Sequence, residues 1–302
     1  MSRRGWLLFL TMGAIWGVPY MMIKVAVEHI TPASLVFLRC AIGAVLLVPI
    51  AAALGHLRAV LPRWRPLLVF AAVEVAGPWL LLSAAEQRLS SSLSGLLTAA
   101  VPLVGALLGW ITGADRLGPR RLAGLVVGLA GVAALVGLDL GTGDLMALLQ
   151  MTGVILGYAL GPFVLSRYLS GVPGLGVVAA ALAVTSVAYL PAAAAQLPRA
   201  WPPAGVVAAV TVLGVLCTAV AFLLFFALID EVGPVRATVI TYLNPAVAVA
   251  LGVAFLGEPF TAGIVVGFVL VLVGSVLATR KNPARPSAEE SRRPAPATVA
   301  EP

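Results

Sequence analysis

Two stretches of the chain carry the same pattern and decide the fold. Residues 94–135 read SGLLTAAVPLVGALLGWITGADRLGPRRLAGLVVGLAGVAAL, and residues 237–278 read ATVITYLNPAVAVALGVAFLGEPFTAGIVVGFVLVLVGSVLA. Aligned without a gap at an offset of 143 residues, they superpose Thr98 on Thr241 and Pro102 on Pro245. Three glycine pairs share this register: Gly109 with Gly252, Gly124 with Gly267, and Gly131 with Gly274. Such a match indicates an internal repeat.

The repeat extends into the earlier part of each half. Gly13-x-x-x-Gly17 matches Gly153-x-x-x-Gly157 at an offset of 140 residues. Glycines four residues apart share one helix face and let membrane helices approach closely. We therefore expect two halves, residues 1–140 and 141–280. Residues 281–302 are rich in Pro, Ala and charge, so we expect a disordered cytoplasmic tail there.

The composition of the chain is that of a membrane protein. Of its 302 residues, 61% are hydrophobic and 10% are charged, and the mean hydropathy is +1.07. Soluble domains carry roughly 25% charged residues. The apolar runs are about 20 residues long, which suits transmembrane helices and is too long for the strands of a barrel. Ten spans are expected: Trp6 to Val27, Ala33 to Leu54, Pro66 to Ala85, Leu93 to Thr112, Leu122 to Leu138, Leu145 to Leu165, Val177 to Ala195, Val206 to Ile229, Ala237 to Leu256, and Gly263 to Ala278.

The basic residues between the spans predict the orientation. With the amino terminus inside, the inner segments hold 15 Lys and Arg residues, whereas the outer loops hold only Arg88 and Arg199. Cytoplasmic loops are the ones enriched in Lys and Arg. We therefore expect both termini in the cytoplasm, which requires an even number of spans.

Five spans in each half have a geometric consequence. Because five is odd, the second half enters the membrane from the opposite side to the first. The expected fold is an all-α membrane protein in which ten transmembrane helices form two inverted five-helix repeats around a central cavity. Inverted repeats of this kind are the usual basis of alternating access.

Several other functions find no support in the sequence. Cys40 and Cys217 lie in apolar runs without C-x-x-C spacing, and His29 and His56 lie in different loops, so no metal site is expected. Nothing resembles a phosphate-binding loop, so no cofactor is expected. The net charge of +7 arises in the gaps between spans, which argues against a nucleic-acid partner.

At particular residues the chain resembles the drug/metabolite transporter superfamily, specifically its members with two EamA repeats. These residues are Trp16-Gly17 with Lys24, Phe37-Leu38-Arg39, Pro102 and Pro245, and Phe255-Leu256-Gly257-Glu258-Pro259. The resemblance covers residues 5 to 280. It implies a ten-span exporter or importer of small metabolites with a cavity between the halves. The chain departs from the pattern at Asp115, where Glu is usual, and at Leu156, where Trp is frequent.

Glu74 is the sharpest candidate for a functional residue, because it lies near the middle of the third span. A charge at the bilayer centre costs about 2.5 to 3.5 kcal/mol on insertion scales. Two interpretations stay open. Glu74 is either a structural carboxylate paired with a basic residue, or a proton-coupling or substrate-binding group that faces the cavity.

Lys24 and Arg39 lie at similar depth in the outer parts of the first two spans. In a structural interpretation, Lys24 reaches the outer interface and Arg39 binds backbone carbonyls or Glu74. In a functional one, the pair makes one end of the cavity positive and attracts the carboxylate of a cargo. The intramembrane balance of one positive charge favours amphoteric or acidic metabolites.

Pro102 and Pro245 occupy matching mid-span positions, where each removes a helical hydrogen bond. We expect a paired kink there that serves as a hinge or a cavity wall, with Thr98 and Thr241 one turn earlier.

Asn244 places an amide at membrane depth, where it contacts either another helix or the cargo. The remaining candidates for the substrate path are the aromatic residues Trp16 and Tyr158. Asp115 and Glu258 each precede a helix, so we expect both to cap it.

These features predict a secondary transporter that is not an enzyme. The expected function is export of small polar metabolites, such as amino acids, across the inner or plasma membrane by alternating access. One alternative is a proton-coupled exporter of drugs or quaternary ammonium compounds, with Glu74 as the cation site. An intramembrane enzyme is disfavoured, because the short loops lack clustered Asp, His or Lys. The expected partners are a small molecule and the lipid bilayer. Proton coupling and the oligomeric state stay open.

Overall fold

The structure is a computed structural model that describes residues 1–113, 118–139, 144–196 and 200–279. Every regular element in these residues is helical. Ten of the helical stretches are long and apolar enough to cross a membrane, as the sequence predicts. Asp115 and the tail at 281–302 lie outside the described residues.

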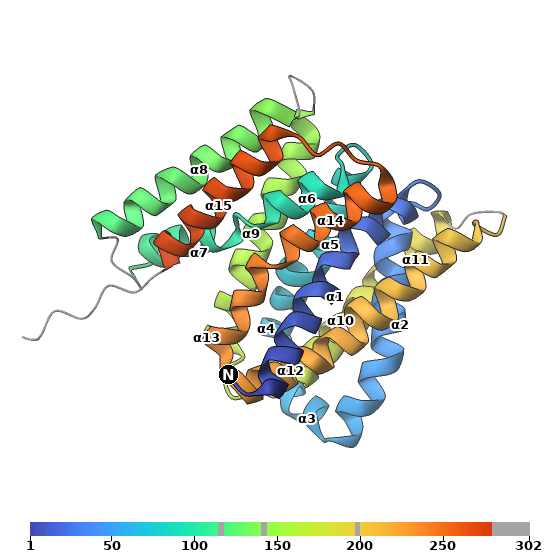
Figure 1. The fold of residues 1–302 in the computed structure, drawn as a ribbon. Coiled ribbons are helices and arrows are strands. Elements are labelled where there is room, and N and C mark those ends of the chain that lie inside the picture. Colours follow the sequence, from blue (N-terminus) through green and yellow to red (C-terminus); the bar gives the residue numbers. More distant parts are fainter. Residues whose placement is uncertain (114–117, 140–143, 197–199, 280–302) are drawn as a thin grey trace, which may run out of the picture.

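Six of the spans are single helices, and Figure 1 shows how they pack together with the segmented ones. These six are α1 (Arg3–Val27), α2 (Pro32–Ala53), α8 (Pro119–Asp139), α9 (Leu145–Tyr168), α10 (Gly174–Gln196) and α15 (Ala262–Thr279).

Spans three and eight each contain a π-helical segment near the middle. Span three is built from α3 (His56–Val60), η1 (Leu61–Arg63), α4 (Trp64–Phe70), the π-helical η2 (Ala71–Ala76) and α5 (Gly77–Glu86). Span eight is built from α11 (Ala204–Gly214), the π-helical η3 (Val215–Val220) and α12 (Ala221–Val232). The two π segments begin 144 residues apart, so they are corresponding parts of the two halves. Such turns frequently occur at functional sites.

Spans four and nine are each interrupted just before a proline. Span four consists of α6 (Ser91–Thr98) and α7 (Val101–Ile111), and Pro102 lies in the first turn of α7. Span nine follows α13 (Pro234–Ala237) and consists of η4 (Thr238–Tyr242) and α14 (Asn244–Leu256), with Pro245 in the first turn of α14. Proline is well tolerated in a first turn, where its missing N–H has no helical partner.

Glycine-lined crossings join the two halves. The helices α8 and α15 run side by side at one edge of the molecule (Figure 1). A Cβ on Gly124 would lie 2.5 Å from the backbone nitrogen of Ala278, and a Cβ on Gly131 would lie 2.6 Å from that of Val271. Both nitrogens belong to α15. Only glycine permits this backbone contact, which supplies the packing that hydrophobicity cannot supply in lipid.

The outer surface of the molecule is apolar, as a bilayer requires. Val45, Leu145 and Phe255 are each more than two-thirds exposed. On a water-soluble protein such residues would be a liability, whereas hydrocarbon chains solvate them.

Candidate functional site

Arg39 on α2 is held by residues from both halves. Its guanidinium lies 3.6 Å from the centroid of the Trp79 ring on α5, a cation–π arrangement. Its Nε donates a hydrogen bond of 3.0 Å to Thr218 Oγ1 of η3. The Thr218 hydroxyl donates in turn to the carbonyl of Leu213 in α11, five residues earlier. The π geometry of span eight therefore orients the hydroxyl that accepts from Arg39.

The rest of the Arg39 guanidinium is uncommitted. The side chain is only 7% exposed, yet no carboxylate in the described residues lies within ion-pair distance of it. The hydrogen bonds of the described residues use only Nε and leave the two Nη groups available. Because Arg presents a planar fork that matches carboxylates, this arrangement is suited to bind one.

Glu74 lies in η2, against the glycine face of α9. A Cβ on Gly161 would overlap its carboxylate, so the absence of a side chain there makes room for Glu74. Its Oε2 is buried and has no hydrogen-bond partner among the described residues. The sequence left open a pairing with a basic residue, but the ion pairs of the described part of the chain do not include Glu74.

Tyr158 of α9 is a partly buried polar residue that lies within electrostatic range of Arg39, Glu74 and Tyr20 of α1. Tyr20 forms a 2.7 Å hydrogen bond with Thr98 at the end of α6. We call these residues the central polar layer: Tyr20, Arg39, Glu74, Thr98, Tyr158 and Thr218.

Lys24 lies in the last turn of α1 and reaches the C-terminal end of span three. Its Nζ donates hydrogen bonds of 2.8 Å to the carbonyls of Glu86 and Leu89. A lysine at a helix C-terminus satisfies carbonyls that have no helical partner. Backbone carbonyls therefore hold the Lys24 ammonium, and a site shared by Lys24 and Arg39 stays a prediction.

Trp16 and Asn244 contact helices of the second half. Trp16 packs against Phe222 and Phe225 of α12, with ring centroids 5.9 and 4.8 Å apart. In the orientation that satisfies the Asn244 amide, its nitrogen donates to Gly13 O at 3.2 Å and to Ile240 O at 2.9 Å. This geometry fits the interpretation of Asn244 as a contact between α1 and α14. Thr241 is partly buried in η4.

Glu258 caps a different helix from the expected one. It precedes α15, but its carboxylate accepts hydrogen bonds from the backbone N–H groups of Ser91 and Ser92, at 2.7 and 2.9 Å, and from the Ser92 hydroxyl. These donors begin α6, which belongs to the first half. Gly257 ends α14 with φ +66° and turns the chain toward α6. The acid therefore joins the two halves.

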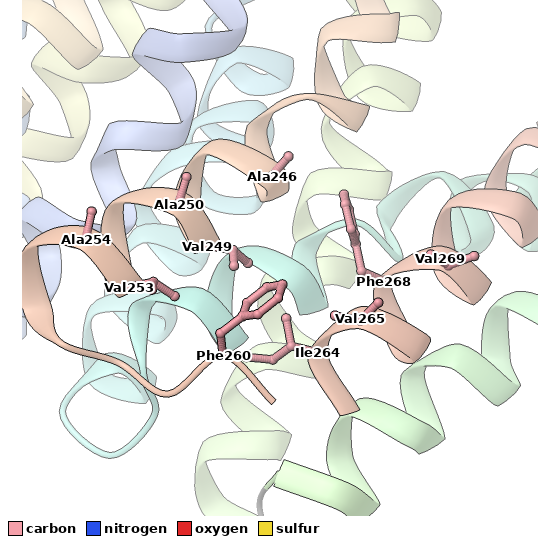
Figure 2. A pocket seen from close by; sticks show the side chains of 10 residues that line it. All are labelled: Ala246, Val249, Ala250, Val253, Ala254, Phe260, Ile264, Val265, Phe268 and Val269. Atoms are coloured by element: carbon pink, nitrogen blue, oxygen red, sulfur yellow. The ribbon is translucent and has the colours of Figure 1, made fainter. Parts of the chain in front are cut away.

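The groove shown in Figure 2 is separate from the central polar layer. It has a volume of about 400 Å³ and lies between α14 and α15, with Phe260 and Phe268 among its lining residues. All ten lining residues are apolar, and several are exposed on the surface that faces lipid. None of the residues predicted for the substrate path lines this groove.

The two-repeat architecture has a counterpart among known protein families. The sequence profile of the EamA-like transporter family matches residues 3–137 and again residues 143–280. This chain belongs to the EamA-like transporter family. The two matches cover the two halves, and together they span all ten helical crossings of this EamA protein.

Individual relatives agree with this assignment. The uncharacterized transporter YvbV of Bacillus subtilis (strain 168) is 24% identical, with 91% of each chain covered. The uncharacterized inner membrane transporter YedA of Escherichia coli (strain K12) is 28% identical, with 92% of this chain and 93% of YedA covered. A solved crystal structure superposes with a TM-score of 0.66 at 22% identity, over 92% of this chain and 97% of that one, and so shares the fold. These names indicate a transporter and not an enzyme.

Sequence reasoning missed several residues that the structure brings forward, among them Tyr20, Thr218 and Glu86. Thr218 lies in an uninterrupted apolar run, and only the π turn and the approach of α2 reveal its role. Glu86 was expected in a loop, because the apolar run of the third span ends at Ala85. In the structure α5 includes Glu86 and buries it completely. The chain therefore holds a second buried acid besides Glu74, at the end of span three.

Proposed function

We propose that this EamA protein exports small zwitterionic metabolites, such as amino acids, by alternating access. The observation that carries the proposal is that the central polar layer contains a guanidinium and a carboxyl group, neither of which has an ion-pair partner among the described residues. Within the described residues, the Nη groups of Arg39 have no carboxylate partner, and Oε2 of Glu74 has no hydrogen-bond partner. Both residues lie within electrostatic range of Tyr158. A zwitterion would satisfy both groups at once, with its carboxylate on Arg39 and its ammonium on Glu74.

The free-energy cost of leaving Arg39 and Glu74 unpaired favours the binding of a ligand between them. Each intramembrane charge costs a few kcal/mol when unpaired, and a protein seldom retains this cost without a function. Hydrogen bonds to charged groups contribute about 1.5 to 3 kcal/mol each. Binding of the cargo would offset part of the desolvation cost of Arg39 and Glu74. Binding would therefore be selective for a cargo that carries both charges.

The proposal also covers the membrane location of the protein and the helices that move during transport. We place the protein in the inner or plasma membrane with both termini in the cytoplasm, because basic residues concentrate in the inner segments. The helix interruptions before Pro102 and Pro245 lie at corresponding places in the two halves and would act as paired hinges. Trp16, Thr241 and Asn244 would form the walls that move with α1 and span nine.

A second candidate function is export of quaternary ammonium compounds or other drugs. The unpaired carboxylate of Glu74 supports it, since a lipophilic cation needs only one acid. Arg39 argues against it, because its guanidinium in the same layer repels a cation. The two candidates therefore make opposite predictions for Arg39.

Counterflow in proteoliposomes separates the candidates. Purified protein is tested with a mixture of labelled L-amino acids and, separately, with labelled tetraethylammonium. We expect amino-acid counterflow that is lost in Arg39→Gln and in Glu74→Gln. Arg58→Gln, which removes an exposed arginine, is the matched control and keeps wild-type flux. Tetraethylammonium flux that survives Arg39→Gln, without amino-acid flux, would support the drug exporter instead.

A further inference from the structure

Glu86 is a buried acid that the proposed substrate site does not use. It is the last residue of α5, at the outer end of span three, and it is 0% exposed. Both of its carboxylate oxygens are buried without a hydrogen-bond partner in the described residues. A charged carboxylate that has lost water and gained no donor is among the most costly groups a protein can hold.

The charges that face Glu86 come from three different elements. Lys24 approaches from α1, Arg39 from α2, and Glu258 from the link at 257–261. The Lys24 ammonium is bound to the carbonyls of Glu86 and Leu89 and forms no ion pair with the carboxylate. The Glu258 carboxylate is bound at the start of α6. A charged Glu86 would therefore have a second acid nearby and no direct counterion among the described residues.

Two hydroxyl groups make this region polar. Ser91 and Ser94 of α6 are 0% exposed, and the hydroxyl of each has no partner among the described residues. The Ser91 hydroxyl and the Glu258 carboxylate both lie close to the Cα of Gly252, where a Cβ would collide with them. The missing side chain of Gly252 therefore leaves space between α6 and α14 for polar groups.

We propose that Glu86 is a proton-binding site and that the proton it carries is the coupling ion of transport. This inference rests on the proposed transport function for the coupling, but not for the proton site itself. While the outer end is closed, the carboxyl group holds a proton and is neutral. On opening, the O–H bond breaks, the proton passes to water on the outer side, and the carboxylate keeps the electron pair.

Lys24 lies close enough to the end of span three to respond when Glu86 loses its proton. A newly charged Glu86 attracts the ammonium that now binds the carbonyls of Glu86 and Leu89. If Lys24 moves to the carboxylate, α1 loses its two hydrogen bonds to the end of span three. Proton release would thus loosen the outer closure, whereas Glu74, with no lysine beside it, remains available to the cargo.

Infrared spectroscopy of the purified protein tests the site without any substrate. We expect the wild-type minus Glu86→Gln difference spectrum at neutral pH to contain the C=O band of a protonated carboxylic acid, with a shift in deuterium oxide. Glu74→Gln is the matched control, because it removes the other acid at depth, and it must leave this band in place. A difference spectrum with only carboxylate bands would overturn the proposal.

Proteoliposomes test the coupling with the labelled amino-acid mixture. We expect Glu86→Gln to keep counterflow, which needs no driving ion, and to lose the stimulation of uptake by a pH gradient. Stimulation that persists in Glu86→Gln, or a sodium gradient that replaces the pH gradient, would overturn the coupling. Absence of wild-type counterflow would instead count against the proposed function and leave the infrared result to decide the proton site.

Discussion

At the scale of single residues, Arg39 shows how a charge is maintained inside the membrane. The Trp79 ring covers one face of the guanidinium, and Thr218 accepts from Nε. Lysine could provide neither the planar stacking nor a donor in the Nε position. The side chain is therefore oriented by two neighbours, while its Nη groups have no hydrogen-bond partner in the described part of the chain.

We predict that Arg39→Lys keeps the protein folded but weakens binding of labelled amino acids. Loss of one charge-assisted hydrogen bond, at about 1.5 to 3 kcal/mol, corresponds to roughly 10- to 150-fold in Kd. Equilibrium binding to purified protein measures the change. Thr218→Val keeps the charge and removes only the orienting hydroxyl, so it should have a smaller effect. Wild-type affinity in Arg39→Lys would contradict the role assigned to the guanidinium fork.

At the scale of elements, the glycine face of α9 determines where span three can lie. Gly153, Gly157 and Gly161 face Leu81, Pro78 and Glu74 in turn, and a Cβ at any of them would collide with its neighbour. The corresponding glycines of α1, Gly13 and Gly17, face span nine instead. Related sequence motifs thus have different partners in the two halves.

We predict that Gly161→Ala displaces the Glu74 side chain. Overpacking of this kind costs about 1 to 3 kcal/mol, so the melting temperature in detergent should fall and amino-acid counterflow should be lost. Gly105→Ala on α7 is the control, because nothing lies within 4 Å of the added Cβ. It should leave both measurements unchanged. Equal effects of the two substitutions would rule out a specific contact between Gly161 and Glu74.

The proline interruptions lead to a separate prediction. Replacing Pro102 with Ala restores a backbone donor and favours a continuous helix from α6 to α7. We expect Pro102→Ala and Pro245→Ala to slow amino-acid counterflow. The Kd for the amino acid should change by no more than about twofold, which is well below a tenfold change, equivalent to about 1.4 kcal/mol. A loss of binding with normal turnover would show that the prolines shape the site and do not act as hinges.

At the scale of the whole molecule, polar contacts join the halves near both ends. Glu258 binds the start of α6, and Arg88 pairs with Asp144 at 3.0 Å. Near the other end, Arg63 donates to the carbonyl of Ser170 at 2.7 Å. Alternating access requires such contacts to break at one end at a time.

The Arg88–Asp144 pair predicts a dependence on pH. A hydrogen bond from the Ala147 amide, together with Arg88, holds the pKa of Asp144 below its ordinary value. The stabilisation is therefore fully present above about pH 4 and is lost as the pH falls through the lowered pKa. We expect the exposed pair to make a small acid-dependent contribution to thermal stability, which Asp144→Asn removes. An unchanged acid profile in that variant would show that the pair contributes nothing measurable.

The sequence predicted much of this architecture because the relevant forces are local. Helix length, hydropathy and the distribution of Arg and Lys determine the ten spans, and the ungapped match of residues 94–135 to 237–278 identifies the repeat. Pro102 and Pro245 marked the helix interruptions for the same reason, since proline acts on its own turn. The π turns carry no such local signal, and Glu86 was missed because hydropathy ends a span at the first charged residue.

Only the tertiary structure decided which polar groups meet. Arg39 and Thr218 are 179 residues apart, and Glu258 and Ser91 are 167 residues apart. No local pattern encodes such pairs, because they depend on how ten apolar helices cross and on which small residues allow close approach. Bilayer insertion depends on each helix separately, whereas the environment of a buried charge depends on all the helices around it. The sequence by itself therefore determined the kind of protein, and packing determined its candidate site.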